Sequence, residues 1–449
     1  MDDKTHNQYN LEDIQAYLAD GKTSTAADYL NGLHPAEIAH ILESLPQGER
    51  VSAWDLIDPE FGGDVLTLVN DEVRSSLIEN TTNDDLVAVA ESLPADDLAD
   101  ILPDLPANVI NKLLHAMDKQ DRSRLESILQ YPDDSAGGLM SIDSVTIRPD
   151  VSLDVIQRYI RFHGELPENT DTLFVVNRED KLLGALPLSF LLTKDPNLKV
   201  ADVFKPDIKS VNINTDQHEI AHLFEKRDLL SAPVVDDSQK LLGRITIDDI
   251  VDVIRDEAEH SILSPAGLDE EDDMFSPVFR SSRRRSVWLG VNLLTALLAS
   301  WVIGLFSATI EQMVALAVLM PIVASMGGIA GSQTLTLMIR GMAVGQVGKA
   351  NAFQLMKKEM LVGLLNGILW ACIIGGLAFL WFNNLELGII LACAILFNLV
   401  VAALAGATIP LMLQRYGADP ALAGGVVLTT ITDVVGFFAF LGLATLFLL

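Results

Sequence analysis

Hydrophobic and polar residues divide the chain at about residue 285. Before that point, apolar residues recur in short runs between polar and charged residues, which is typical of amphipathic helices and short strands. After it, five apolar stretches are each long enough to cross a bilayer, and we place them at residues 286–309, 313–342, 358–382, 386–414 and 420–449. The sequence therefore predicts a polar part followed by an α-helical membrane domain with five transmembrane helices.

Residues 1–132 are predicted to form short amphipathic helices that are separated by Pro and Asp. An internal repeat is visible, because residues 33–42 resemble residues 93–102 and a Leu-Pro pair follows each of them. Repeated helix pairs stack on their neighbours to bury a continuous core. The pattern predicts an all-α superhelical N-domain.

Residues 133–260 contain short β-branched runs, and the order β-α-β-β-α occurs there twice. This arrangement resembles a tandem pair of cystathionine-β-synthase (CBS) modules with an α/β fold, which we place at residues 133–200 and 201–260. The second module ends in Gly243–Asp249, similar to the closing pattern of nucleotide-binding CBS modules. The resemblance implies that Thr246 and Asp249 bind ATP or another adenine nucleotide. The first module ends in Ser189 and Phe190 and lacks that Asp.

The charge of the chain is concentrated before the predicted spans. Lys and Arg number 31 against 61 Asp and Glu, for a net charge of −30, yet 49% of residues are apolar and mean hydropathy is +0.31. From residue 286 onward acidic and basic residues balance, so the excess lies on residues 1–285. Such a charge excludes a nucleic-acid-binding protein, which needs a basic face. It suggests a membrane protein that meets cations.

The distribution of Lys and Arg predicts the orientation of the spans. Basic residues precede the first span, at Arg280 and Arg283–Arg285, and the other inter-span basic groups are Lys349, Lys357, Lys358 and Arg415. The alternate loops and the C-terminus have none. Because Lys and Arg are enriched in cytoplasmic loops, we expect the N-terminal domains in the cytoplasm and the C-terminus outside. No signal peptide is visible in the polar first residues.

One acidic residue, Asp433, lies deep in a predicted span. An ionised carboxylate at the bilayer centre costs at least about 2.5–3.5 kcal/mol, so such a residue normally faces a water-filled path. Thr429 precedes it by four residues and shares its helix face. Oxygen ligands alone suit Mg²⁺ and disfavour Zn²⁺ or Cu⁺. The alternative is a neutral Asp433 that is hydrogen-bonded to another helix.

Glycine-rich segments occur in the second and fifth spans. Gly327, Gly328 and Gly331 should either break the helix, so that freed carbonyls line a cavity, or allow tight helix packing. Gly424 and Gly425 have the same two interpretations. Three asparagines within the spans are expected to form hydrogen bonds between helices, namely Asn292, Asn366 and Asn398.

The helix after the second module carries a stripe of acidic residues. Asp248, Asp252 and Asp256 are spaced four residues apart and share one face. Like charges at that spacing destabilise a helix by about 0.2–0.5 kcal/mol per pair. We expect a divalent cation to neutralise them, and the alternative is a solvated acidic face. Residues 261–285 are expected to connect this helix to the membrane domain.

The order of these parts resembles the MgtE-type magnesium channels over essentially the whole chain. The most specific segments are residues 135–140, 327–333, 419–422 and 429–436. The resemblance implies a homodimer in the inner membrane of a bacterium, with one pore between the second and fifth spans of both subunits. It also implies that Asp433 holds a largely hydrated Mg²⁺ together with oxygens around Gly328 and Thr429.

The same resemblance implies a cytoplasmic magnesium sensor, in which bound Mg²⁺ bridges acidic residues and holds the pore shut. The expected regulatory ligands are Asp96, Asp97, Asp100, Asp216, Asp228, Asp248, Asp249, Asp252, Glu257 and Asp419. The chain departs from the family pattern at Ile329, at Gly424–Val426, and at His260 and Ser261, where acidic residues are common.

The sequence thus predicts a Mg²⁺ channel or transporter that imports the ion down the membrane potential. A transporter of Co²⁺, Mn²⁺ or Ca²⁺ remains an alternative, as does a membrane-tethered CBS sensor of nucleotide or metal that conducts nothing. We do not expect an enzyme, because the sequence contains neither a nucleophile–base arrangement nor a Gly-rich phosphate loop.

Overall fold

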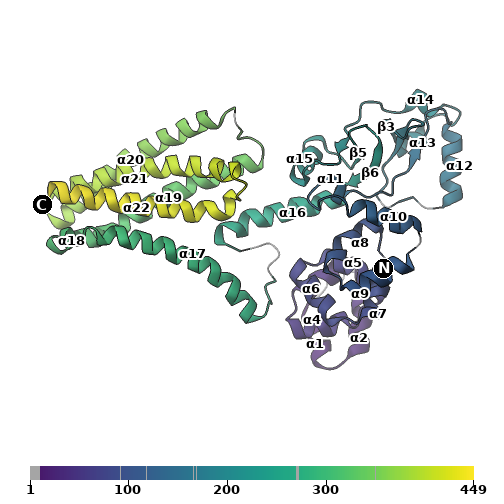
Figure 1. Cartoon of the computed structure of the whole chain (residues 1–449), viewed down its shortest axis with the longest axis horizontal. Helices are drawn as coiled ribbons and strands as arrows, with labels where there is room; N and C mark the ends of the chain where they lie inside the picture. Colours follow the sequence, from purple (N-terminus) through teal and green to yellow (C-terminus); the bar gives the residue numbers. More distant parts are fainter. Residues whose placement is uncertain are drawn as a thin grey trace, which may run out of the picture. The chain divides into compact units, whose positions relative to one another are not determined.

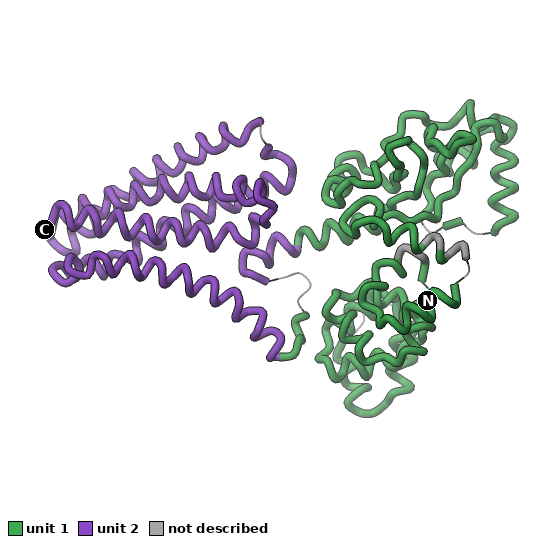
Figure 2. Tube along the Cα trace, in the orientation of Figure 1, with its two compact units in different colours: residues 1–258, 271–277 green, residues 259–270, 278–449 purple. Residues whose placement is uncertain are grey.

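The computed structural model describes residues 11–448 apart from 92, 118, 165, 168, 269–272 and 349. The described chain forms two compact units (Figures 1 and 2). The first comprises residues 1–258 and 271–277, and the second comprises residues 259–270 and 278–449. Each contains the elements that the sequence predicts, so the multidomain fold of helical repeats, paired CBS modules and five long helices is confirmed.

The first part of unit 1 is a stack of short helices around one apolar core. The helices are α1 (Leu11–Ala19), α2 (Thr23–Leu30), α3 (Pro35–Glu43), α4 (Gln47–Trp54), α5 (Pro59–Leu68), α6 (Asp71–Asn80), α7 (Asn83–Glu91), α8 (Ala95–Ile101), η1 (Leu102–Asp104), α9 (Ala107–Ala116) and α10 (Lys119–Ile128). The sequence repeat is a structural repeat. Helices α3 and α8 occupy matching positions in the two copies, and α4 and α9 each begin after the Leu-Pro pair.

The second part of unit 1 contains two three-stranded sheets with the same topology. In the orders β1-β2-β3 and β4-β5-β6, the first pair is parallel and the second pair is antiparallel. The elements are α11 (Ala136–Leu139), β1 (Thr146–Ile147), α12 (Leu153–His163), β2 (Thr172–Val176), β3 (Leu182–Pro187), α13 (Leu188–Thr193), α14 (Val200–Val203), β4 (Val211–Asn212), α15 (Gln217–Arg227), β5 (Ser231–Val235), β6 (Leu241–Thr246), α16 (Ile247–Leu263) and η2 (Ser264–Ala266). The predicted β-α-β-β-α order is therefore present twice.

A fully buried ion pair joins the N-terminal helices to the linker that follows α16. The Arg50 side chain is 1% exposed, and its Nη1 and Nη2 donate to the two carboxylate oxygens of Asp273 at 2.8 and 3.0 Å. Arg50 also donates to the backbone carbonyls of Leu42 and Leu45. The Asp273 N–H in turn donates to the Glu72 carboxylate at 3.2 Å. This part of the linker is thus fixed to the N-terminal helices.

Unit 2 contains five helices that are long and apolar enough to cross a membrane, within the described residues. They are α17 (Val278–Gly304), α19 (Ala315–Ala343), α20 (Ala352–Phe382), α21 (Leu385–Arg415) and α22 (Pro420–Phe447), and a short helix α18 (Ser307–Gln312) follows α17. Helix α21 packs against α19, α20 and α22 and is the most buried of the five. Helix α17 begins eight residues before the predicted first span, so its basic cluster is helical.

The glycine segment of the second span does not break its helix, because α19 is continuous from Ala315 to Ala343. A Cβ on Gly327 would lie 2.2 Å from the Asn398 side chain, and one on Gly331 would lie 2.8 Å from Leu428. These two glycines therefore serve close packing. A Cβ on Gly328 would meet nothing within 4 Å, so this glycine faces open space. Of the two interpretations, helix packing is the correct one.

Candidate functional site

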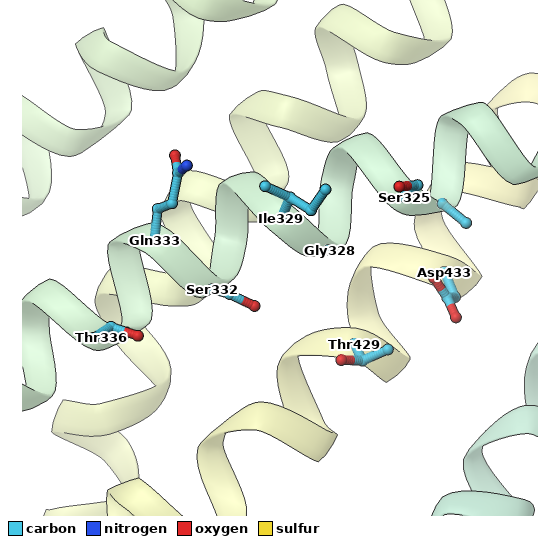
Figure 3. A pocket seen from close by; sticks show the side chains of 9 residues that line it. Ser325, Gly328, Ile329, Ser332, Gln333, Thr336, Thr429 and Asp433 are labelled. Carbon is cyan, nitrogen blue, oxygen red and sulfur yellow. The ribbon is translucent and has the colours of Figure 1, made fainter. Parts of the chain in front are cut away.

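A cavity of about 710 Å³ lies between α19 and α22 in the membrane domain (Figure 3). It brings together the three residues that we expected around a pore cation, Gly328 from α19 and Thr429 and Asp433 from α22. Ala324, Ser325, Ile329, Ser332, Gln333 and Thr336 complete the lining. Residues on helices that are far apart in sequence thus meet at one polar site.

The α19 wall supplies most of the polar groups of the cavity. Ser325, Ser332 and Thr336 lie on one helix face, because positions that differ by seven and four residues stack above one another. Gln333 adds an amide to the same wall. Our sequence analysis did not identify these four side chains. Ser325, Ser332 and Thr336 could have been found from their spacing, because they follow Gly328 or precede it at helical intervals of three or four residues. This spacing is meaningful only if the glycine segment is an unbroken helix.

The Asp433 carboxylate is half-buried, and no hydrogen bond or ion pair joins it to another described residue. Thr429 uses its hydroxyl hydrogen to donate to the Gly425 carbonyl at 2.9 Å, which leaves its oxygen lone pairs available. Figure 3 shows both side chains on neighbouring turns of α22, beside α19. The cavity therefore offers one negative charge and several neutral oxygens, a donor set that suits a hard, partly hydrated cation.

Polar contacts in the membrane domain support the helices behind this cavity. Asn398 on α21 is 1% exposed and donates to the Val323 carbonyl on α19 at 3.0 Å, so the expected inter-helix bond is present. Asn292 instead bonds within its own helix, and Asn366 is exposed. Glu359 on α20 is a buried acid that we did not predict. It accepts a bond from Thr334 and lies 3.2 Å from Lys358.

The expected regulatory carboxylates of unit 1 mostly cap or bridge their own elements. Asp216 caps α15 by accepting from the His218 N–H, and Asp228 ends the same helix in the left-handed region, with a φ of 50°. Asp248 accepts from Asn169 at 2.7 Å. Within the described residues no group of three or more His, Cys, Asp or Glu is arranged to hold a metal. The expected regulatory carboxylates therefore do not come together in a metal site among the described residues.

The acidic stripe of α16 is partly neutralised by an arginine on the same helix. Arg255 lies 3.5 Å from Asp252 and 3.6 Å from Asp256. Glu257 lies 3.2 Å from His218 of α15. All of these side chains are between one-third and two-thirds exposed. Exposed pairs of this kind contribute only about 0–1 kcal/mol each, so the stripe remains accessible to a cation.

In the N-terminal helices, the expected ligands lie on α8. Asp100 is exposed and Asp97 is half-buried, and both interact with other groups. The side chain of Asp96 lies outside the described residues. All three residues therefore belong to one short helix.

Asp419 is the N-cap of α22, where its carboxylate accepts from the Ala421 and Leu422 N–H groups, both at 2.9 Å. His260, near the end of α16, lies 3.2 Å from the same carboxylate. The helix N-terminus also favours negative charge at this position. A histidine therefore contacts the Asp419 carboxylate directly.

The expected nucleotide residues Thr246 and Asp249 lie together at the junction of β6 and α16. Asp249 accepts from both the N–H and the hydroxyl of Thr246, each at 3.1 Å. Thr246 is 6% exposed. Both bonds go to Oδ2 of Asp249, so the pair closes the turn into α16 through one of the two carboxylate oxygens.

Comparison with known sequences agrees with this architecture. A sequence model of the MgtE family, described as a divalent cation transporter, matches residues 320–443, which include the whole cavity lining. Models of the MgtE intracellular N domain and of the CBS domain match residues 33–134 and 200–256. The matches fall in the order in which the helical stack, the second CBS module and the membrane helices occur.

Two curated relatives align with the chain over nearly its whole length. The magnesium transporter MgtE of Bacillus subtilis (strain 168) is 28% identical over 443 residues, which cover 96% of each chain. That of Thermus thermophilus is 29% identical over 453 residues, which cover 97% of this chain and 98% of the relative.

A solved structure resembles the part of the chain that precedes the spanning helices. The crystal structure of the cytosolic domain of the Mg²⁺ channel MgtE in complex with ATP is 29% identical with a TM-score of 0.50, and the match covers 54% of this chain and 100% of that one. The domain order, the membrane cavity and the relatives that align over nearly the whole chain all agree. The chain therefore belongs to the MgtE family of divalent cation transporters.

Proposed function

We propose that the chain is a Mg²⁺ channel or transporter of the inner bacterial membrane, with its N-terminal domains in the cytoplasm and its C-terminus outside. The observation that carries this proposal is the oxygen-lined cavity around Asp433 in the membrane domain. Mg²⁺ gives up its water reluctantly, so one carboxylate with neutral hydroxyls suits an ion that keeps most of its hydration shell. The relatives are named as transporters of magnesium, and no catalytic role is proposed.

The driving force for import is the membrane potential. Moving one charge through 100 mV changes its free energy by about 2.3 kcal/mol, so a divalent ion moving inward gains about 4.6 kcal/mol. Transport down this gradient needs no ATP hydrolysis. An adenine nucleotide would act instead as a regulatory ligand at Thr246 and Asp249, which the ATP complex of the related cytosolic domain supports.

The active form is proposed to be a homodimer. Ser332, Gln333, Thr336 and Thr429 are exposed on the surface of the single chain although they lie within spanning helices. Polar residues inside a membrane normally face protein or water and not lipid, so a second copy that faces this surface would complete the pore. We expect Ile329→Cys, at the rim of the cavity, to form an oxidant-dependent crosslinked dimer, whereas Leu365→Cys on the exposed side of α20 should not. Equal crosslinking at both positions would contradict this arrangement.

Regulation is proposed to come from Mg²⁺ that binds the carboxylates of the cytoplasmic part and favours a closed pore. Asp96, Asp97 and Asp100 of α8, Asp216, Asp228, the α16 carboxylates and Asp419 are the proposed ligands. The separate positions of these groups in the structure fit a sensor whose sites are completed when a cation draws them together.

The proposal is tested by Mg²⁺ flux into proteoliposomes under an inside-negative potential, in vesicles in which the N-terminal domains face the lumen. We expect inward flux that grows with the potential and falls as Mg²⁺ rises on the cytoplasmic face. Flux of Co²⁺, Mn²⁺ and Ca²⁺ is measured in parallel, and a measurement with added ATP tests whether the nucleotide regulates the flux. Folded protein that conducts none of these ions would favour the non-conducting sensor, and a preference for another ion would reject Mg²⁺ as the cargo.

A further inference from the structure

Asn398 occupies a junction of three helices behind the candidate pore. It belongs to α21, which contributes nothing to the cavity lining. Its side chain is 1% exposed, and its Nδ2 donates to the Val323 carbonyl of α19 at 3.0 Å. A buried amide between membrane helices is held by such bonds. Asn398 therefore contacts the backbone of a pore-lining helix from its rear side.

Two glycines make room for this amide. A Cβ added at Gly327 of α19 would lie 2.2 Å from Nδ2 of Asn398, and one added at Gly436 of α22 would lie 2.7 Å from the same atom. Separations below 3.0 Å cannot be accommodated without a shift of the helices or of the amide. The Asn398 side chain thus acts as a spacer between α19 and α22, the two helices that form the cavity.

The contacts of the spacer are adjacent to the cavity residues along both helices. Gly327 directly precedes Gly328, and Gly436 follows Asp433 by three residues, which is less than one helical turn. A displacement of either glycine therefore moves a wall of the cavity. The distance across the cavity near the carboxylate depends on what fills the junction.

The amide is not the residue that stability alone would favour here. Its Oδ1 is buried and has no hydrogen-bond partner among the described residues. A buried acceptor without a partner typically costs more than a single hydrogen bond, such as the one from Nδ2 to the Val323 carbonyl, contributes. Polar groups that are retained at such a cost are expected at functional positions.

We propose that Asn398 is a positioning residue of the cation pathway, which sets the separation of α19 and α22 and thereby the size of hydrated ion that the cavity accepts. This inference rests on the proposed transport function and deepens it. The side chain acts through Val323, Gly327 and Gly436 and does not itself touch the ion. Its loss should change selectivity and leave the cytoplasmic regulation intact.

The experiment compares Asn398→Leu with Asn366→Leu, the same change at an exposed asparagine of α20. Fluxes of Mg²⁺ and Ca²⁺ into proteoliposomes are measured together with the melting temperature of each purified protein. For Asn398→Leu we expect an unchanged melting temperature and a Mg²⁺/Ca²⁺ flux ratio that shifts by at least about fivefold. Leucine loses the bond to Val323 and places a branched group in place of the planar amide against Gly327 and Gly436, and pore dimensions influence such ratios. The cytoplasmic Mg²⁺ concentration that halves the flux should stay as in the wild type.

A second variant approaches the junction from the opposite helix. Gly436→Ala places a methyl group against the amide, and we expect it to shift the flux ratio, with partial recovery in the Gly436→Ala/Asn398→Ala pair because the smaller side chain frees the space. An unchanged ratio in folded Asn398→Leu, or a loss of folding in that variant, would overturn the inference. Wild-type protein that conducts no ion would instead overturn the proposed function itself.

Discussion

Asp433→Ala is expected to lose about nine-tenths or more of the inward Mg²⁺ flux. The carboxylate is the single negative charge of the cavity lining, and without it the ion exchanges bulk water for neutral oxygens alone. A loss of about 1.4 kcal/mol in the attraction for the ion already lowers occupancy tenfold. Flux into proteoliposomes at a fixed inside-negative potential measures the effect, and growth rescue of a magnesium-dependent strain gives a second readout.

A matched control separates the loss of this charge from a general loss of acidic groups. Glu311→Ala removes an exposed carboxylate of α18, which lies outside the cavity lining, and should conduct as the wild type does. Asp433→Asn keeps the size of the side chain and should still lose most of the flux. Full flux in folded Asp433→Ala would reject the cavity as the ion pathway.

The double variant Asp248→Asn/Asp252→Asn is expected to need at least about tenfold more cytoplasmic Mg²⁺ for half-inhibition of the flux. This shift is equivalent to about 1.4 kcal/mol of lost coupling. Both side chains lie on the α16 stripe, and their partners, Asn169 and Arg255, leave them accessible. Asp249 is kept, because its contact with Thr246 closes the turn into the helix. The dose–response of flux against cytoplasmic Mg²⁺ is the measurement.

The control for this experiment removes the same charge elsewhere in the CBS pair. Asp150→Asn/Asp207→Asn neutralises two exposed carboxylates outside α16 and should leave inhibition unchanged. If both double variants shift the dose–response curve of the flux equally, the effect would come from net charge, and the acidic stripe of α16 would have no specific role. An unchanged curve in the α16 double would remove Asp248 and Asp252 from the proposed sensor.

The elements with strong periodicity could be predicted from the sequence. The five spans, the repeat that becomes α3 and α8, and the strands β2 and β5 follow from hydropathy, spacing and β-branched runs. The start of α17 could not, because its first turns are polar and basic and differ little from a linker. The continuity of α19 could not either. Glycine lowers helix propensity, but packing against Asn398 and Leu428 stabilises the helix by contacts that lie far away in sequence.

The same limit applies to the candidate site. Asp433 was recognisable alone, because a carboxylate deep in an apolar run has few structural uses. Ser325, Ser332 and Thr336 were not, since hydroxyl residues in a spanning helix usually bond to their own backbone. Only the position of α22 shows that they line the same cavity as the carboxylate. Charge patterning along α16 did indicate an accessible acidic stripe, but it could not show that Arg255 already bridges part of it.

The buried contact between Arg50 and Asp273 has a consequence for where the chain can be divided. A fragment that ends with α16 at Leu263 lacks Asp273 and leaves the Arg50 guanidinium enclosed without its counter-charge. Removing one partner of such a pair costs about 3–5 kcal/mol, a large share of the stability of a small domain. A fragment that extends to Pro277 keeps both partners. The N-terminal helices should therefore be less stable in the shorter fragment than in the longer one, although they lie far from the cut in the sequence.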